Sequence, residues 1–367
     1  MFKREDDFVG WLRSRLAGVG RGLVLGIGDD AALVRPAPGR ELILTSDWTI
    51  EDVHFRLKLH PPESVGHRAL ARALSDVAAM GGRPRWALVS VALSKRISTS
   101  WVKRFYGGLS RLARRSGVVV AGGDTSVVAD KVAIDIAVAG DVARGQALRR
   151  SGARPGGAIF VSGRLGLSAL GLKLLEAGVQ PKEGPGRDAL RVHLFPEPQL
   201  GLGEFLARRR LATAMMDVSD GLSTDLARLC QASGVGARVW EMLLPIPTAT
   251  VPGKVGELSG LPSRPARGGR AEPSPTTAAG AERSSAVALT VATSDPLALA
   301  LHGGEDYQLL FTVSPRAAKK LPAQLCGVAL HPIGVIDPGN TVHLVRASGK
   351  VEPLKPAGFD HFRKFRE

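Results

Sequence analysis

Residues 62–82 read PESVGHRALARALSDVAAMGG and predict a helix over Pro62–Met80. The glycine pair that follows would end this helix. Asp76 falls in a segment apolar enough to be largely buried, and a buried carboxylate is costly unless it has a partner. The segment therefore predicts a largely buried helix whose acid needs a partner. Four apolar residues recur at every fourth position and would share one helix face: Val65, Ala69, Ala73 and Val77.

Further acidic motifs follow apolar runs elsewhere in the chain. We expect each of them at the end of a strand or the start of a helix, where the loops of a rigid scaffold usually carry chemistry. If the acids converge, they raise one another's pKa values unless a cation neutralises them. Oxygen ligands favour Mg²⁺, particularly beside phosphate groups, so the pattern predicts metal-assisted phosphoryl transfer. The motifs are Gly26-Ile-Gly-Asp-Asp30, Thr45-Ser-Asp47, Gly122-Gly-Asp124, Asp217-Val-Ser-Asp220 and Gly303-Gly-Glu-Asp306.

Composition restricts the class of protein. The chain has 367 residues, 44% of them apolar, which is enough for two domains with their own cores. Its formal net charge of +15 comes mainly from scattered Arg; this charge could attract nucleic acid, but solvated helix faces are the simpler interpretation. Cys230 and Cys326 lie far apart, so we expect neither a disulfide framework nor a thiolate metal site. Residues 1–7 lack the apolar core of a signal peptide, and no apolar run approaches the roughly 20 residues of a membrane span, so we expect a cytoplasmic protein.

The remaining pattern predicts an α/β fold of the α+β type, with two mixed α/β domains. Pro and Gly cluster at Arg150–Gly157, so we place the N-terminal domain at 1–149 and the C-terminal domain at 150–367. Residues 250–290 are rich in Pro, Gly, Ser, Thr and Ala, which predicts a flexible insertion. Expected helices cover 1–17, Thr99–Ser116, Gln199–Arg210 and Leu222–Ser233, with another from Leu167. Expected strands include Ala31–Arg35, Glu41–Ser46, Trp86–Leu93, Val118–Ala121, Lys131–Val142, Ala158–Ser162, Ala214–Val218, Ala237–Glu241 and Tyr307–Val313.

Signatures of several other enzyme classes are missing. The chain has no G-x-x-x-x-G-K-[ST] loop, no complete G-x-G-x-x-G, no protein-kinase catalytic loop and no G-x-S-x-G, and its His residues lack ligand spacing. Any one acid could simply occupy a turn or cap a helix. The prediction therefore rests on the whole set of acids, beside glycines that allow backbone N–H groups to approach phosphate.

Taken in order, the motifs resemble those of the thiamine-monophosphate kinase family, within the superfamily that includes aminoimidazole ribonucleotide synthetase. The resemblance runs from about residue 8 to residue 362. It departs from the family pattern at Gly157, where members usually have Asp, and in the extra segment at 250–290. The matching pieces are Gly26–Ala32, Leu74–Gly81, Gly122–Thr125, Arg150–Gly156, Asp217–Leu222 and Gly303–Tyr307.

The resemblance implies ATP-dependent phosphorylation of thiamine monophosphate to thiamine diphosphate with several Mg²⁺ ions. It also implies a homodimer whose N-terminal sheets associate into a barrel, with ATP and Mg²⁺ bound by the N-terminal domain. The acceptor is the substrate's own phosphate, which is already anionic, so no protein nucleophile is needed and we expect direct in-line transfer without a phosphoenzyme.

The resemblance also assigns individual residues by motif position. Metal ligands would be Asp30, Thr45, Ser46, Asp47, Asp76, Asp124, Asp217 and Asp220. The acids expected to be essential for catalysis are Asp30, Asp47, Asp76, Asp124 and Asp220. Contacts to ATP would come from Gly123, Asp124, Arg150 and Ser219, and the thiamine monophosphate pocket from His54, Glu305 and Phe359.

Two alternative functions follow from the same residues. Aminoimidazole ribonucleotide synthetase is the enzymatic runner-up, although its own motifs match less closely. Selenophosphate synthetase needs a reactive Cys near its N-terminus and the hydrogenase maturation protein a C-terminal Cys, and this chain has neither. A nucleic-acid-binding protein would show steep salt dependence and no need for Asp76 or Asp124; we expect neither nucleic acid nor membrane as a partner.

Overall fold

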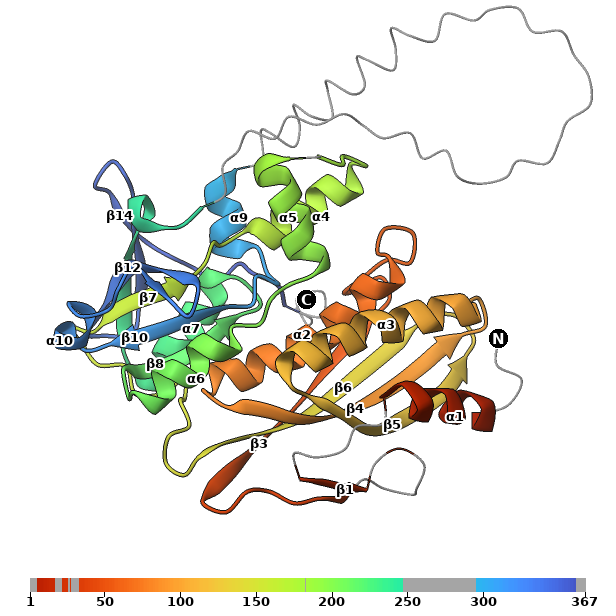
Figure 1. The fold of residues 1–367 in the computed structure, drawn as a ribbon. Coiled ribbons are helices and arrows are strands. Elements are labelled where there is room, and N and C mark those ends of the chain that lie inside the picture. The colour runs from red at the N-terminus through yellow and green to blue at the C-terminus, as the bar shows by residue number, and fades with distance from the viewer. Residues whose placement is uncertain are drawn as a thin grey trace, which may run out of the picture.

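The structure, a computed structural model, describes residues 5–16, 22–25, 27, 33–181, 183–246 and 295–360. The expected ligand Asp30 and the expected insertion at 250–290 lie outside the described residues. Figure 1 shows two sheets with helix α2 (Pro62–Ala79) between them. Within the described ranges, no helix is both long and apolar enough to cross a membrane.

The N-terminal sheet has four strands, in the order β3-β6-β4-β5. Only β4 and β5 run parallel; the other neighbours are antiparallel. Helices α2 and α3 (Thr99–Ser116) cover one face (Figure 1). The strands are β3 (Arg40–Ile50), β4 (Arg83–Ser94), β5 (Val119–Val128) and β6 (Ala133–Ala143). Helix α1 (Glu5–Leu16) and the short pair β1 (Leu23–Leu25) and β2 (Leu33–Val34) precede them.

Alternation along β3 gives the two faces of this sheet different character. Ile43 and Thr49 are buried on the helix side, and Thr45 and Asp47 share their face because side chains alternate along a strand. On the opposite side, which we call the open face, four large apolar side chains are exposed. They are Leu42, Leu44, Trp48 and Leu88.

The C-terminal sheet has the strand order β14-β13-β9-β12-β7-β10-β8, with β11 paired to β12. It is also mixed, because β9 and β13 run parallel while the other neighbours are antiparallel. Its strands are β7 (Ala158–Ser162), β8 (Ala212–Val218), β9 (Gly236–Trp240), β10 (Gln308–Val313), β11 (Gln324–Leu325), β12 (Val328–Asp337), β13 (Val342–Val345) and β14 (Val351–Pro353).

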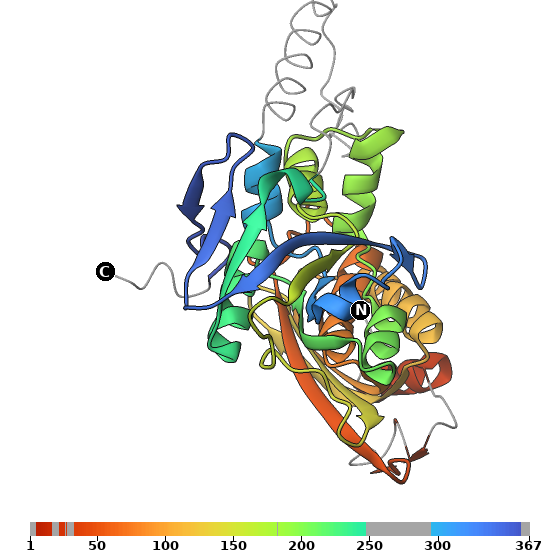
Figure 2. The same cartoon turned by 90° about the vertical axis from the view of Figure 1, so that its left-hand side faces the viewer.

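Helices of the C-terminal part pack in separate groups. Helices α4, α5 and α9 lie beside the sheet (Figure 2) and share a small apolar core that contains Leu170, Leu174 and Leu299. Helix α6 packs on α2, where Leu202 and Leu206 of α6 form one apolar cluster with Ala78 of α2. The helices are α4 (Leu167–Glu176), α5 (Gly184–Leu194), α6 (Leu200–Arg208), α7 (Leu222–Ser233), η1 (Glu241–Leu243), α9 (Pro296–His302) and α10 (Pro315–Ala318).

These observations confirm the predicted mixed α/β class and correct parts of the element assignment. Helices α3 and α7 and strand β7 have the predicted bounds. The predicted strand Val118–Ala121 was too short: β5 continues through Gly122-Gly-Asp124, so this motif lies inside a strand and not at its end. Gly123 has φ +154°, and a Cβ there would lie 1.9 Å from the Val89 carbonyl oxygen, so only glycine fits this close strand pairing. Helix α5 was not predicted. The domain boundary at 149/150 stays a prediction, as does the barrel, which involves a second chain.

Close packing of α2 against α3 depends on Gly108. A Cβ at Gly108 would lie 1.9 Å from the Glu63 backbone carbonyl oxygen, whereas one at neighbouring Gly107 would meet only the Arg111 side chain at 3.7 Å. We expect Gly108→Ala to lower the free energy of unfolding by about 1–3 kcal/mol, because the helices must move apart. Gly107→Ala should instead raise it by about 0.5–1 kcal/mol through helix propensity. Urea denaturation of both variants checks this; equal effects at the two positions would contradict the packing account.

Candidate active site

The acid in the middle of α2 has a partner from the N-terminal sheet. The Thr45 hydroxyl, on the helix side of β3, donates a hydrogen bond to Asp76 Oδ2 at 2.5 Å. Asp47 lies two residues further along the same face, and its Oδ1 is 3.6 Å from an Arg72 Nη. Strand alternation and helix periodicity thus bring Thr45, Asp47, Arg72 and Asp76 together.

Asp217 joins this group from the C-terminal sheet. It lies near the end of β8 and accepts a hydrogen bond from the Ser75 hydroxyl at 2.7 Å. Burial and the nearby charge of Asp76 raise the pKa of Asp217 to about 8. Burial and Asp76 also raise the pKa of Asp47 to about 6, although Arg72 opposes this shift. The group therefore holds more negative charge than its protein neighbours compensate.

A groove of about 530 Å³ opens beside these acids. Thr45, Asp76 and Asp217 line it on one side. Arg149 and Arg150 bring positive charge to the same groove, which also has an apolar wall that includes Met80 and Met215. The expected ATP contact Arg150 therefore lies in one groove with three of the expected metal ligands.

Two other expected ligands lie on the open face. The Ser46 hydroxyl donates to Asp135 Oδ1 at 2.6 Å, and Ser90 stands in register between Asp135 on β6 and Asp124 on β5. The chain therefore does not bring Ser46 and Asp124 together with Asp47 and Asp76. Asp135 was missed, although a lone acid between Ile134 and Ile136 was a usable signal. In the described part of the chain, no three His, Cys, Asp or Glu side chains are placed to hold a metal ion by themselves.

The turn after β8 is organised by Asp225, another residue that sequence reasoning missed. Its Oδ2 accepts backbone N–H groups of Ser219, Asp220 and Gly221 at 3.0–3.1 Å. Burial and the Asp220 charge raise the pKa of Asp225 to about 6. The expected ligand Asp220 accepts a hydrogen bond from Arg228 at 2.5 Å. The turn thus holds Ser219 and Asp220 in a fixed conformation.

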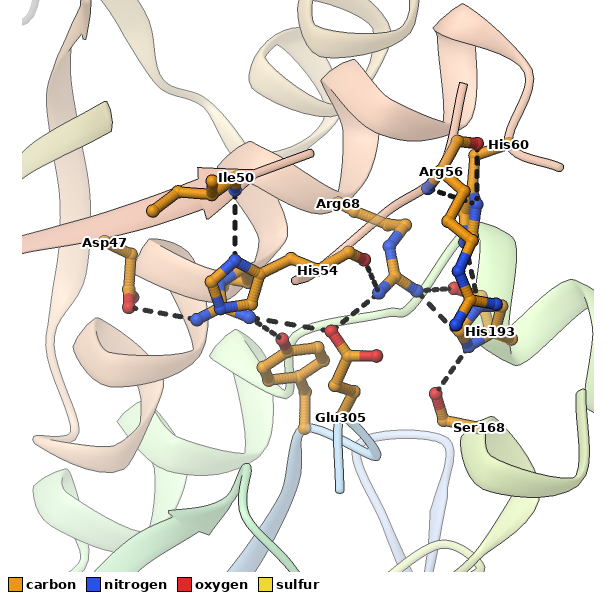
Figure 3. A network of polar contacts seen from close by, with 11 residues as sticks. Asp47, Ile50, His54, Arg56, His60, Arg68, Ser168, His193 and Glu305 are labelled. Atoms are coloured by element: carbon orange, nitrogen blue, oxygen red, sulfur yellow. Dashed lines mark hydrogen bonds and ion pairs between the residues drawn. The ribbon is translucent and has the colours of Figure 1, made fainter. Parts of the chain in front are cut away.

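Two of the residues expected at the acceptor pocket, His54 and Glu305, lie close together in Figure 3, and the third, Phe359, lies beside His54. The rings of His54 and Phe359 are 6.5 Å apart, and His54 Nδ1 accepts the Ile50 backbone N–H at 3.0 Å. Backbone N–H groups of Glu305 and Phe359 donate to the carbonyl oxygens of Ser219 (2.7 Å) and Asp220 (3.0 Å). The turn after β8 therefore connects the acceptor side with the acids.

Two arginines of α2 border Glu305. Arg68 donates to Glu305 Oε1 at 2.6 Å, and an Nη of Arg72 lies 3.5 Å from the same oxygen. Burial alone would raise the pKa of Glu305, but the Arg68 and Arg72 charges outweigh burial and hold it at about 2. Arg72 also donates to the Tyr307 hydroxyl at 3.2 Å. Sequence reasoning missed both arginines, although each interrupts the same apolar segment that singled out Asp76.

Comparison with known proteins matches the two halves of the chain to the N-terminal and the C-terminal domain of one kind of protein. The family model "AIR synthase related protein, N-terminal domain" matches residues 28–142, and "AIR synthase related protein, C-terminal domain" matches residues 154–345. The thiamine-monophosphate kinase of Synechococcus elongatus is 33% identical over 342 residues, which cover 91% of each protein.

Solved structures give the same result. The thiamine-monophosphate kinase of Stenotrophomonas maltophilia superimposes with a TM-score of 0.72 at 32% identity, covering 91% of this chain and 94% of that one. A structure described as "AaThiL complexed with AMPPCP and TMP" has a TM-score of 0.69 at 30% identity and covers 98% of this chain and 97% of its own. The resemblance found in the motifs thus extends over nearly the whole chain.

The raised pKa of Asp217 predicts how the metal-free protein responds to pH. Its folded-state value of about 8 exceeds the ordinary 3.8, so between these pH values the folded protein keeps a proton that the unfolded chain releases. Stability is therefore lost as pH rises from about 4 to about 8. Asp217→Asn removes this loss, and we expect its free energy of unfolding to exceed that of the parent by about 1–3 kcal/mol at pH 8 but not at pH 4.5.

Urea denaturation with a chelator present measures this difference. Asp130→Asn, at an exposed acid between β5 and β6, is the control and should behave like the parent at both pH values. A gain for Asp217→Asn that is the same at pH 4.5 and pH 8 would contradict the assigned charge state.

Proposed function

We propose that this chain, which belongs to the thiamine-monophosphate kinase family, transfers the γ-phosphoryl group of ATP to thiamine monophosphate and forms thiamine diphosphate and ADP. The observation that carries the proposal is the position of α2. One face of this helix contributes Asp76 to the acidic groove and Arg68 and Arg72 to the cluster of His54, Glu305 and Phe359. A donor and an acceptor that occupied these two places would meet beside Asp47.

We propose that Mg²⁺ binds beside Asp47, Asp76 and Asp217. The donor set fits a hard cation: it consists of carboxylates whose pKa values are raised by burial and by one another's negative charge, which a cation would neutralise. Mg²⁺ commonly uses only one or two carboxylates together with substrate phosphates, so a complete protein cage is not required. When bound, Mg²⁺ would reduce the repulsion between the two polyanionic substrates and polarise the transferred phosphoryl group.

The protein residues themselves would mainly position the reactants. Arg150 and Arg149 offer positive charge to the phosphates of ATP in the groove. Glu305, kept ionised by the arginines, suits a cationic acceptor ring, and Phe359 offers an aromatic face to it. Because the acceptor phosphate is already anionic, we propose direct in-line transfer without a covalent enzyme intermediate.

Two free cysteines, Cys230 and Cys326, fit a reducing compartment, and we propose a cytoplasmic enzyme.

A purified-protein assay tests the function. With ATP, Mg²⁺ and thiamine monophosphate, the wild-type chain should form thiamine diphosphate and ADP in equal amounts, and excess chelator should stop the reaction. Asp76→Asn should lower kcat by about 100-fold or more, because it removes a carboxylate proposed to hold Mg²⁺, which would stabilise the charge of the transferred phosphoryl group. Asp130→Asn should keep wild-type turnover. Failure to form either product while ATP still binds would show that the acceptor is wrong.

We also propose that two copies of the chain associate through the open face. Leu42, Leu44 and Trp48 on β3 and Leu88 on β4 expose large apolar side chains on one face of the sheet, which is typical of an interface. Such an interface would be isologous, because a twofold axis would bring the same sheet surface of both copies together.

Charge introduced at the centre of this face tests the dimer. Leu44 is 74% exposed, and Leu44→Asp should convert a dimer to a monomer in light scattering at micromolar concentration. Met242 is 78% exposed on η1, away from the open face, so Met242→Asp is the matched control and should remain dimeric. A wild-type chain that is monomeric at high concentration would refute the proposal.

A further inference from the structure

Arg68 is a buried charged side chain in the middle of α2, with only 2% of it exposed. One of its Nη atoms donates both to Glu305 Oε1 at 2.6 Å and to the backbone carbonyl of His54 at 3.2 Å. The other donates to the backbone carbonyl of His193 (Figure 3). A single guanidinium thus connects α2 with three segments that are far apart in the sequence.

The backbone at Glu305 is strained, and the position of its carboxylate depends on separate contacts. Its φ of +64° lies in the left-handed region, which costs energy for a residue with a Cβ, and Tyr307 follows with φ +49°. The Glu305 N–H is fixed on the Ser219 carbonyl at 2.7 Å, which sets the backbone but leaves the carboxylate to be placed by its own contacts. The ion pair with Arg68 provides the shortest of these contacts.

The same guanidinium also holds His54 in place. It holds the His54 carbonyl, while the Ile50 backbone N–H donates to the ring at Nδ1. Together these bonds fix the backbone and the ring plane, and the ring faces Phe359 at 6.5 Å. Two of the three residues assigned to the acceptor therefore depend on one buried side chain that lies behind them.

Only arginine fits this arrangement. Its planar fork directs several N–H donors at fixed angles, so it satisfies three acceptors in different directions, whereas lysine presents a compact charge on a flexible stem. Arg68→Lys would therefore retain the positive charge while losing the geometry.

We infer that Arg68 is a positioning residue for the acceptor substrate: it holds Glu305 and His54 in the arrangement that receives the thiamine ring system, without touching the substrate itself. This inference rests on the proposed function. Arg68 of α2 would then contribute to the affinity for thiamine monophosphate, whereas ATP binding in the groove would not depend on it.

Steady-state kinetics of the full chain with ATP, Mg²⁺ and thiamine monophosphate test the inference. Arg68→Lys should raise KM for thiamine monophosphate about 10-fold or more, the usual effect of losing a hydrogen bond to a charged group, while KM for ATP stays within about two-fold. A merely structural role would reduce the amount of active enzyme and leave both KM values unchanged. The control is Arg104→Lys on α3, which alters a bidentate ion pair with Glu63 of α2 at 2.7 and 2.9 Å and should keep both KM values.

A double-mutant cycle separates an effect through Glu305 from a direct one. Glu305→Gln, Arg68→Gln and the double variant are compared. Because Arg68 acts partly through Glu305 and partly through His54, the double variant should raise the acceptor KM above that of Glu305→Gln, but by less than the product of the two single effects. Because it leaves no lone buried charge, the double variant also serves if Arg68→Lys does not fold.

An unchanged acceptor KM in a folded Arg68 variant, or additive effects in the cycle, would overturn this inference and leave the proposed function standing. A wild-type chain that does not phosphorylate thiamine monophosphate would overturn both.

Discussion

Helix α2 must be apolar enough to lie between two sheets and yet present charge to the site, and the rest of the structure depends on how these demands are reconciled. Its buried residues cover most of its length. Arg68, Arg72 and Asp76 are spaced four apart, so they occupy one face of the helix. Charges in this position are tolerated only with partners. The partners come from β3 and from the segment before β10, which ties the two sheets to one helix face.

The order of the charges along α2 also divides the site. The N-terminal two of the three are cationic and neutralise Glu305, whose pKa falls to about 2, while the third is anionic and adds to Asp47 and Asp217, whose pKa values rise. Arg72 lies between the two groups: one of its Nη atoms is 3.5 Å from Glu305 Oε1, and the other is 3.6 Å from Asp47 Oδ1. Glu305 is thus neutralised by protein side chains, whereas the group of Asp47, Asp76 and Asp217 has fewer cationic neighbours and would favour a bound cation.

Much of the fold was predictable because its signals are local. The bounds of α3 follow from the Ser98 cap and from Gly117 in the left-handed conformation. The extent of β5 was not predictable, since Gly122 and Gly123 normally weaken a strand, and only the pairing with β4 keeps them extended. Helix α5 begins Gly-Pro-Gly, which predicts a turn, and its packing against α4 overrides this local signal. The pairing partner of Asp76 was expected, but its identity as Thr45 depends on a contact between residues 31 apart.

The motif at residues 45–47 shows what sequence order alone leaves out. A motif assigns one role to consecutive residues, whereas a strand sends consecutive side chains to opposite faces. Thr45 and Asp47 face α2 and the acids, while Ser46 points to the open face and pairs with Asp135. The alternation of side chains along β3 therefore places residues of one sequence motif on two different faces of the sheet. In β3 the same alternation lets one strand supply polar groups to the candidate site from one face and leaves apolar side chains exposed on the other.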